Sequence, residues 1–287
     1  MELKGKKIVV IGMGKTGIAT ASFLGAHGAA VVAVDEKPFS QWGEGVEPLT
    51  GQPWLKVGDY DVTVLDGVDL VVSSPGIPPG NDILSAAQKN GIPIISELEL
   101  AYRFIRVPIV AVTGTNGKTT ATTLLGKILA YAGKKIFIGG NIGNPLIDYA
   151  GFPQTDDFIV AEISSFQLQW TSTFRPHAAI LLNITCDHVN YHGSFEAYRQ
   201  VKASIFKNQQ EADLAVLNAE DDAQEGLAAS VRSQVVLFSS KRSLKAGVFV
   251  QGETIVYLKP DGTEEHYPLS MISLPGCIEF SWVAPPH

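Results

Sequence analysis

Short apolar runs recur along the first third of the chain, and turn residues or amphipathic stretches separate them. The runs KKIVVI (6–11) and AAVVAV (29–34) come first, and VDLVVSS (68–74) and GIPIIS (91–96) follow. Apolar runs of this length, bounded by Gly, Pro and polar residues, are typical of strands buried in a parallel sheet, with helices between them. We therefore expect a Rossmann-like parallel sheet in residues 1–95.

The same alternation continues after residues 97–106, ELELAYRFIR, which we expect to form a linking helix. The later candidate strands are PIVAV (108–112), KKIFIG (134–139), DFIVAEIS (157–164), HAAILLNIT (177–185), ADLAVLN (212–218) and QVVLFS (234–239). Residues 247–269 alternate at period two around Gly252 and the Asp261-Gly262 pair, which predicts antiparallel hairpins.

These patterns together predict an α/β fold with two domains. A Rossmann-like domain occupies residues 1–95, and a linker helix occupies 96–107. A P-loop ATPase-type α/β domain with added antiparallel β-hairpins occupies 108–276, and residues 277–287 form a tail that fits no pattern.

Composition narrows the class of protein. The chain has 287 residues, 45% of them hydrophobic, and a net charge of −7, which gives no basic surface for nucleic acid. Its two cysteines, Cys186 and Cys277, are too few for a disulfide framework, and no apolar run reaches membrane-spanning length. The sequence has no CxxC or HExxH zinc pattern. We therefore expect a cytoplasmic protein with small-molecule partners and without nucleic acid or membrane partners.

Residues 111–120, AVTGTNGKTT, join an apolar run to a helical pattern. Gly114 and Gly117 permit the tight turn that brings backbone N–H groups close to an anion. Lys118 supplies positive charge, and the two threonines after it, at the helix start, can offer a hydroxyl to Mg²⁺. The general P-loop has another glycine five positions before Gly117, where this chain has valine. The stretch predicts a short phosphate-binding loop, and a structural glycine turn is the alternative.

A second glycine-rich turn, GMGKTG at residues 12–17, follows the first apolar run and opens a helical stretch. This is the GxGxxG spacing in its strand–turn–helix context, and Asp35 ends the next run, where a dinucleotide fold has its ribose-binding acid. NAD is therefore one interpretation. The motif itself indicates only a diphosphate at a helix N-terminus, so another nucleotide diphosphate, or a turn without a ligand, stays open.

Three further polar groups stand in or after later runs. Glu162 ends one run, and a carboxylate buried there needs a cation, for which Mg²⁺ held with a nucleotide is an economical partner. Asp187 and His188 follow another run; His188 either approaches a second metal or lies at the surface after a helix N-cap aspartate. Lys202 lies in the helical pattern of residues 194–208, where spacing alone predicts a surface lysine.

Several stretches in chain order resemble the ATP-dependent Mur ligases of bacterial cell-wall synthesis. They are GMGKTG, SPGIP, SELEL, GTNGKTT, GGNIG, EISSFQL, LNITCDH, HGSFEAY and KASIF, and they span nearly the whole chain. The short phosphate loop is this family's own form. The dinucleotide-type first domain separates the chain from folylpolyglutamate synthetases, which are similar only in the ATP domain.

The resemblance implies a ligase in which ATP converts a substrate carboxylate to an acyl phosphate, which an amino-acid amine then attacks. The stretches are nearest to the family member that adds D-glutamate to UDP-N-acetylmuramoyl-L-alanine, so these substrates, ATP and two Mg²⁺ ions are implied. The GxGxxG turn would then bind UDP and not NAD. Such an enzyme serves peptidoglycan synthesis and thereby cell-wall biogenesis, cell shape and cell division. Another Mur-type ligase and a non-catalytic nucleotide-binding module remain alternatives.

The resemblance also implies roles for individual residues, including a carbamylated Lys202, which would turn an ammonium into an anionic metal ligand. The implied catalytic residues are Lys118, His188 and Lys202. The implied ATP-binding residues are Gly114, Thr115, Asn116, Gly117, Lys118, Thr119 and Thr120. The implied metal ligands are Thr119, Glu162, His188 and Lys202. The implied substrate-binding residues are Gly14, Lys15, Thr16, Asp35, Glu36, Lys37, Ser74, Gly76, Asn141 and Ser164.

Two regions depart from the family pattern. After the Asp-His pair the family usually has Asp and Arg where this chain has Asn190 and Tyr191, which removes two charges beside the metals. SLPG (273–276) begins like the family's LPGxHN segment, but residues 277–287 do not continue it. We expect this chain to lack the family's third domain, which recognises the amino acid and closes over ATP. We therefore expect a truncated or frame-shifted chain that binds the UDP-sugar and has little ligase activity alone.

Overall fold

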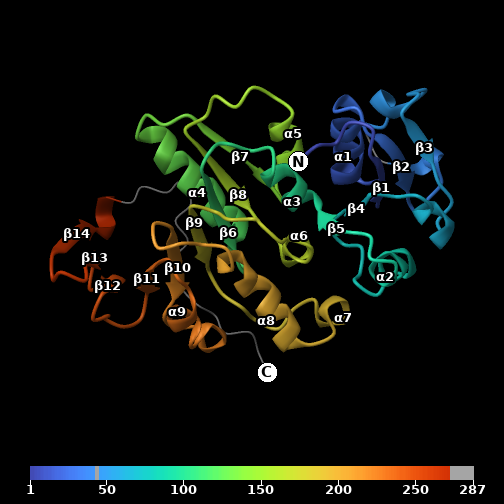
Figure 1. The fold of residues 1–287 in the computed structure, drawn as a ribbon. Helices are drawn as coiled ribbons and strands as arrows, with labels where there is room; N and C mark the ends of the chain where they lie inside the picture. The colour runs from blue at the N-terminus through green and yellow to red at the C-terminus, as the bar shows by residue number, and fades with distance from the viewer. Residues whose placement is uncertain (43–44, 272–287) are drawn as a thin grey trace.

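The computed structural model describes residues 1–42 and 45–271, and the tail 277–287 lies outside them. The described chain forms two α/β units, each built on its own sheet (Figure 1). Strands β1 to β5 make the first sheet, and β6 to β14 make the second. The predicted fold class, a Rossmann-like parallel sheet followed by a larger α/β unit, is confirmed, while the exact domain boundaries remain a prediction.

The first sheet is entirely parallel, in the order β3-β2-β1-β4-β5. Its strands are β1 (Lys7–Ile11), β2 (Ala30–Val34), β3 (Leu55–Val57), β4 (Leu70–Ser73) and β5 (Ile94–Ser96). Its helices are α1 (Lys15–Ala26) and α2 (Asp82–Lys89). The strand order reverses between β1 and β4, and ligands of such sheets bind beyond the carboxyl ends of the strands at that point.

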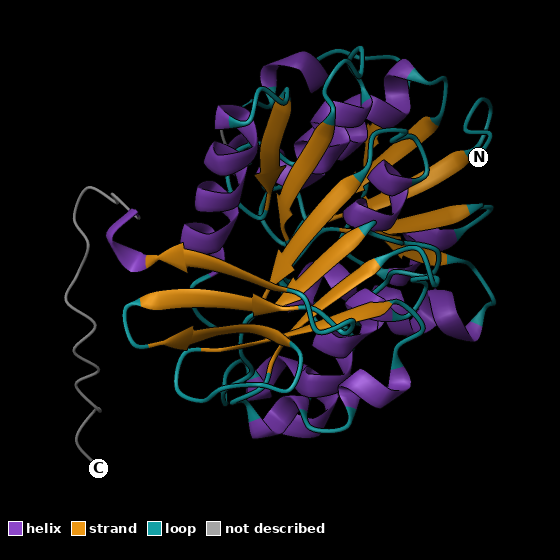
Figure 2. Ribbon diagram, turned by 90° about the vertical axis from the view of Figure 1, so that its left-hand side faces the viewer, coloured by secondary structure: helices purple, strands orange, loops and turns teal. Residues whose placement is uncertain are grey.

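The second sheet has the order β14-β13-β12-β11-β10-β9-β6-β8-β7. Its strands are β6 (Ile109–Thr113), β7 (Ile136–Gly140), β8 (Phe158–Glu162), β9 (Ala178–Leu181), β10 (Leu214–Asn218), β11 (Gln234–Ser239), β12 (Gly247–Gln251), β13 (Thr254–Leu258) and β14 (Glu264–Pro268). The predicted antiparallel hairpins are β12, β13 and β14. Because β12 pairs in parallel with β11, they extend the sheet at its edge (Figure 2).

The helices of the second unit cover the two faces of its sheet (Figure 1). The helices after β5 are α3 (Glu97–Tyr102), which lies between the two units, and α4 (Lys118–Tyr131), α5 (Leu146–Ala150), α6 (Ser165–Leu168), α7 (Val189–His192), α8 (Phe195–Ala203) and α9 (Leu227–Ser230). The described residues also form 3-10 turns at Phe39–Gln41, Glu47–Leu49, Val62–Leu65, Ser204–Phe206, Asp222–Gln224 and Leu269–Met271. In the part of the chain described, no helix has the length and apolar character needed to cross a membrane.

The central strands are apolar because helices cover both of their faces. In β1, Ile8, Val9, Val10 and Ile11 are all 0% exposed. This pattern is characteristic of parallel sheets, whose strands are continuous hydrophobic runs without alternation. The loops at the strand ends are thereby left as the places where polar side chains can gather.

Helix α3 joins the two units and is shorter than the predicted helix over 97–106. It ends at Tyr102, and the chain then continues in turns toward Pro108 and β6. Its first turn is stabilised by Ser96, whose Oγ accepts the N–H of Glu99 at 3.2 Å. The helix packs against both α5 and α1, so it lies in the junction between the two sheets.

Two carboxylates of α3, Glu97 and Glu99, are completely buried. Glu97 Oε1 accepts the N–H of Ile147 in α5 at 2.8 Å, while its Oε2 is buried without a hydrogen-bond partner. Burial raises the pKa of Glu97 to about 7. Burial acts on Glu99 in the same direction, but hydrogen bonds from Thr173, Ser172 and Arg103 outweigh it and lower the pKa of Glu99 to about 2.

The free energy of unfolding is expected to depend on pH through Glu97. Since its pKa is 4.5 in a free chain and about 7 in the fold, the folded state binds an extra proton between these values. Stability should therefore fall as pH rises through this window. In urea unfolding at several pH values, Glu97→Gln should flatten the slope, while Glu211→Gln, at an exposed position, should not. An unchanged slope in Glu97→Gln would contradict this assignment.

Candidate active site

A cavity of about 470 Å³ lies beyond the carboxyl ends of β1 and β4. Its lining residues are Gly12, Gly14, Lys15, Thr16, Gly17, Asp35, Ser74, Pro75, Gly76 and Ile77. We call it the nucleotide pocket. The predicted substrate residues from the glycine-rich turn and from the turn after β4 meet here, together with Asp35. Two other predicted residues, Glu36 and Lys37, are exposed and do not line it.

Hydrogen bonds within the nucleotide pocket shape its glycine-rich turn. Ser74 Oγ donates to the carbonyl of Gly12 at 2.7 Å. Asp35 Oδ2 accepts the N–H of Met13 at 2.5 Å, and its Oδ1 accepts the N–H of Lys37 at 2.8 Å. Asp35 therefore uses part of its acceptor capacity on the backbone. Its place at the end of β2 is thus explained without a ribose, which weakens the argument for NAD.

Lys15 reaches out of the nucleotide pocket toward the second sheet. Its Nζ donates to the carbonyl of Gly143 at 2.7 Å and lies 3.4 Å from Asn144 Oδ1. The predicted contact of Lys15 with a nucleotide remains a prediction. The sequence did not indicate that its ammonium would connect the first glycine-rich turn to the turn that carries Asn141.

The predicted phosphate loop, residues 114–120, follows β6 and opens α4. Gly117 has φ +80°, a left-handed conformation that glycine adopts without strain, and it is the N-cap of α4. The loop is bound to the turn after β9, because Asn183 Oδ1 accepts the N–H of Asn116 at 2.8 Å and Asn183 Nδ2 donates to the Asn116 carbonyl at 3.0 Å. Lys118 Nζ donates to the Thr115 carbonyl at 2.9 Å, so the ammonium lies over the loop.

Glu162 brings three of the predicted residues together. It ends β8 beside Val112 of β6 and is 2% exposed. Its Oε2 accepts the hydroxyl of Thr119 at 2.7 Å, and its Oε1 accepts the side-chain amide of Asn141 at 2.8 Å. A buried carboxylate therefore faces the start of α4 on one side and the 140–144 turn on the other.

The 140–144 turn must pass very close to β8. Gly140 has φ +102°, and a Cβ there would lie 2.4 Å from the carbonyl oxygen of Glu162. The N–H of Asn141 donates to that same carbonyl at 2.8 Å. The glycines of the GGNIG stretch thus allow the close approach that places Asn141 on Glu162.

Lys202 is 2% exposed, so the expectation of a surface lysine was wrong. It lies one turn after Tyr198 on α8, and both side chains occupy the buried face of that helix. Lys202 Nζ donates to the carbonyl of Gly114 in the phosphate loop at 2.7 Å and lies 4.9 Å from the centre of the Tyr198 ring. Burial, aided by the charge of Lys118, lowers the pKa of Lys202 to about 7.

His188 lies at the start of the one-turn helix α7. Its φ of +51° is the only positive value at a non-glycine residue in the described chain. Its side chain is 45% exposed, and the ring centre is 4.8 Å from that of Phe166 and 6.3 Å from that of Tyr198. Tyr198 therefore lies near both His188 and Lys202.

The predicted metal ligands do not form a conventional cluster. Within residues 1–42 and 45–271, no group of three or more His, Cys, Asp or Glu side chains could hold a metal ion. The predicted set consequently depends on the Thr119 hydroxyl and on a modified Lys202. The metal-binding roles of Glu162 and His188 remain predictions.

Two other predicted residues have evident structural surroundings. Ser164 is the N-cap of α6, where it forms a capping box with Gln167. Its predicted substrate contact is untested, and its position is explained by the helix. Thr120 is exposed in the first turn of α4.

Sequence reasoning missed Asn183 and Tyr198, which hold the phosphate loop. The hydroxyl of Tyr198 is 3.1 Å from that of Thr115, which also accepts the N–H of Thr185 at 2.9 Å. Both residues lie inside stretches that carried the family resemblance, LNITCDH and HGSFEAY. A polar residue directly after a predicted buried strand, as Asn183 is, was the available signal.

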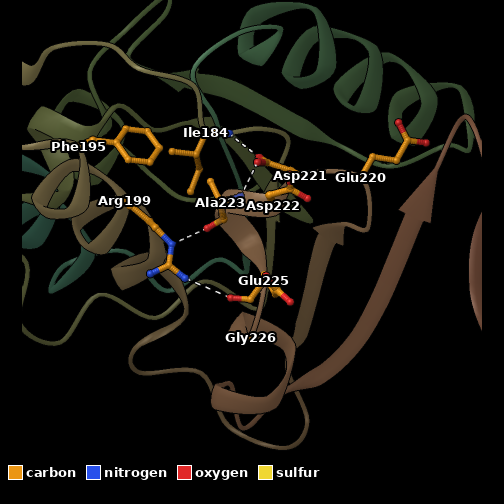
Figure 3. Close-up of a pocket in the computed structure, with 9 residues that line it drawn as sticks. All are labelled: Ile184, Phe195, Arg199, Glu220, Asp221, Asp222, Ala223, Glu225 and Gly226. Carbon is orange, nitrogen blue, oxygen red and sulfur yellow. Dashed lines mark hydrogen bonds between the residues drawn. The ribbon is translucent and has the colours of Figure 1, made fainter.

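A second cavity, of about 740 Å³, lies beside the turn that holds the phosphate loop. Figure 3 shows that Arg199 points at two backbone carbonyls, those of Ala223 at 2.5 Å and Glu225 at 3.2 Å. Asp221 accepts the N–H of Ile184 at 2.6 Å. These side chains hold the 220–226 turn in place, and we assign the cavity no ligand.

Comparison with known proteins agrees with this geometry. Residues 6–96 match the family described as Mur ligase MurD-like, N-terminal domain, and residues 112–273 match the Mur ligase middle domain. The chain is 50% identical over 279 residues to the UDP-N-acetylmuramoylalanine--D-glutamate ligase of Syntrophus aciditrophicus and 43% identical over 277 residues to that of Geobacter metallireducens. In each case 96% of this chain is covered, and the chain spans 61% of the relative's length.

Solved structures show the same fold at lower identity. The UDP-N-acetylmuramate:L-alanyl-gamma-D-glutamyl-meso-diaminopimelate ligase of Neisseria meningitides is 20% identical, with a TM-score of 0.56, over 91% of this chain and 86% of that one. The murein peptide ligase of Psychrobacter arcticus is 20% identical, with a TM-score of 0.53, over 95% of this chain and 62% of that one. The first family match includes the residues of the nucleotide pocket, and the second includes the phosphate loop. The chain therefore belongs to the Mur ligase family.

Proposed function

We propose that this chain carries the UDP-sugar and ATP sites of a ligase that joins D-glutamate to UDP-N-acetylmuramoyl-L-alanine. The names of the relatives at 43–50% identity support this substrate pair. The observation that carries the proposal is the burial of Lys202 on the Gly114 carbonyl. A structural glycine turn does not require a buried lysine beside it. In a site for phosphates and metal ions, a buried lysine that is carbamylated can serve as an anionic metal ligand.

The two sites bind different substrates. The UDP diphosphate occupies the nucleotide pocket at the N-terminus of α1, where free N–H groups and the helix dipole favour anions. ATP lies on the phosphate loop, with Lys118 against its β- and γ-phosphates. The substrate carboxylate attacks the γ-phosphorus, ADP leaves, and the amine of D-glutamate then displaces phosphate from the acyl phosphate. The protein contributes positioning and charge neutralisation more than covalent chemistry.

The residues around Glu162 fit Mg²⁺. The ion prefers oxygen ligands, and Glu162 Oε2 and the Thr119 hydroxyl lie 2.7 Å apart at the start of α4. We assign these two oxygens to one Mg²⁺, and a second ion would be held by His188 and by the carbamate of a modified Lys202. When bound, Mg²⁺ neutralises charge on the phosphate oxygens. The buried carboxylate of Glu162 also supplies the compensating negative charge that such an ion needs.

Lys202 has the chemistry required for carbamylation. Its pKa of about 7 leaves a neutral amine at mildly alkaline pH, and only the neutral amine attacks CO₂. The N–C bond forms, one proton is released to solvent, and the product is an anionic carbamate. The carbamate nitrogen keeps one N–H, which can still donate to the Gly114 carbonyl. Burial disfavours the new anion unless cations are present, so Mg²⁺ should stabilise it.

Carbamylation of Lys202 is testable by ¹³C NMR. With ¹³C-bicarbonate, Mg²⁺ and ADP, above the pKa of about 7, the protein should show one carbamate carbonyl signal. Lys202→Gln should remove it, and Lys127→Gln, at an exposed position on α4, should keep it. A signal that survives in Lys202→Gln, or no signal with both ligands bound, would contradict the assignment.

Ligand-dependent stability separates this proposal from its alternatives. UDP-N-acetylmuramoyl-L-alanine and Mg·ATP should each raise the midpoint of thermal unfolding, because each binds only the folded state, and NADH should not. Stabilisation by NADH alone would favour an oxidoreductase. Stabilisation by neither nucleotide would leave only a structural role for the two glycine-rich turns.

A further inference from the structure

Tyr191 joins the candidate ATP site to the wall of the nucleotide pocket. Its phenol donates to the carbonyl of Ile77 at 2.7 Å, and Ile77 lines the nucleotide pocket. The two residues are 114 positions apart in the sequence. Ile77 lies in a loop of the first sheet, and Tyr191 lies in a connection of the second sheet. This position is one at which the chain departs from the usual family pattern, since tyrosine replaces an expected arginine.

Tyr191 is also fixed to His188. The N–H of Tyr191 donates to the His188 carbonyl at 3.0 Å within the single turn of α7, and the N–H of His192 donates to it at 3.1 Å. A one-turn helix closed by such bonds moves as a unit. Displacement of the Tyr191 hydroxyl would therefore displace the backbone of His188.

The ring of Tyr191 packs against helix α6. It packs edge-on against Phe166 with ring centres 4.5 Å apart, and His192 beside it has its Nε2 3.0 Å from the Ser165 hydroxyl. The phenol donates its proton to the Ile77 carbonyl while the ring stays packed on Phe166. The hydroxyl is thus a directed contact on a packed ring and not a mobile surface group.

We propose that Tyr191 is a positioning residue that couples the two nucleotide sites: its bond to Ile77 sets the place of His188 according to whether the nucleotide pocket is filled. This inference rests on the proposed function. The turn after β4 contains Gly76, with φ +95°, and forms one wall of the pocket. A ligand that draws this wall into its bound position therefore draws α7 and His188 with it, and favours ATP at the phosphate loop.

Tyr191→Phe tests the proposal because it removes the hydroxyl and leaves the ring on Phe166. Calorimetry would measure the affinity for Mg²⁺ with a non-hydrolysable ATP analogue, with and without saturating UDP-N-acetylmuramoyl-L-alanine. In the unmodified chain the sugar nucleotide should raise this affinity at least about fivefold, the lower end of typical coupling. In Tyr191→Phe the increase should fall below about twofold while each ligand alone binds as before. Tyr131→Phe, at a tyrosine that is 97% exposed, should keep the full increase.

A second readout follows His188 itself. In the unmodified chain, UDP-N-acetylmuramoyl-L-alanine alone should shift the imidazole NMR signals of His188, assigned with His188→Gln, and in Tyr191→Phe it should not. A purely structural role for the hydroxyl would lower the unfolding midpoint and leave this shift intact. Coupling retained in Tyr191→Phe, or no coupling in an unmodified chain that binds both ligands, would overturn the inference and leave the proposed function standing. Failure of the unmodified chain to bind either ligand would overturn the proposed function, and this inference with it.

Discussion

Lys118→Ala is expected to weaken binding of Mg·ATP by about one to two orders of magnitude and to leave UDP-sugar affinity unchanged. The Nζ lies over the phosphate loop on the Thr115 carbonyl, at the N-terminus of α4, where phosphates are favoured. A hydrogen bond to a charged group contributes about 1.5–3 kcal/mol. Losing this contribution to the free energy of ATP binding gives the expected decrease in affinity. Isothermal titration calorimetry measures both affinities on one protein sample.

Lys127→Ala is the matched control for Lys118→Ala. Lys127 lies on the same helix, α4, and its side chain is exposed, so the substitution removes the same charge at a distance from the loop. It should leave ATP affinity nearly unchanged, since exposed charges are screened by solvent and salt. Equal ATP affinity in folded Lys118→Ala and in the unmodified chain would show that the loop has a structural role only.

The sequence was sufficient to predict the parts of the site that lie next to each other along the chain. The phosphate loop follows a buried strand and opens a helix, and both features can be identified from local patterns. The position of Glu162 beside it was also predictable. Parallel strands end at one edge of a sheet, so the last residue of β8 had to come near the loop after β6.

The burial of Lys202 could not be predicted from spacing. On α8 it repeats the buried position of Tyr198 one turn earlier, but a lysine on a predicted apolar face usually extends its charge to solvent. Only the resemblance to a family gave this lysine a reason to face inward. The structure adds a physical account, in which the Gly114 carbonyl accepts its N–H and burial lowers its pKa to about 7.

Contacts between distant loops were also beyond sequence reasoning. The bonds of Lys15 to Gly143 and of Tyr191 to Ile77 cross between the two units. Each depends on how the sheets are placed relative to each other, which no local pattern records. The SELEL stretch is a similar case: its letters match a family motif, but only the fold places both of its glutamates, buried, in the junction.

Glu99→Ala is expected to destabilise the protein by about 3–5 kcal/mol, the range for breaking a buried charged pair from one side. The Glu99 carboxylate accepts the N–H groups of residues 172–174 at 2.9–3.1 Å and the Nε of Arg103 at 2.9 Å. Its removal leaves the backbone donors of a turn unsatisfied in the junction between the two sheets. Glu99→Gln keeps one acceptor oxygen and should cost about 1–3 kcal/mol. Urea unfolding gives both values, and the exposed control Glu211→Ala should change stability by no more than about 0.5 kcal/mol.

The pH dependence of Glu99 must be opposite to that of Glu97. The pKa of Glu99 is 4.5 in a free chain and about 2 in the fold, so the unfolded state binds the extra proton between these values. The stabilisation is fully present above about pH 4.5 and is lost as pH falls toward about 2. In Glu99→Gln this acid-side loss should be reduced, whereas the decline between about 4.5 and 7, which belongs to Glu97, should persist. Acid unfolding of Glu99→Gln with the same slope as the unmodified chain would mean that the hydrogen bonds from residues 172–174 do not stabilise the ionised form, and the acid-side loss of stability would then have to come from other groups.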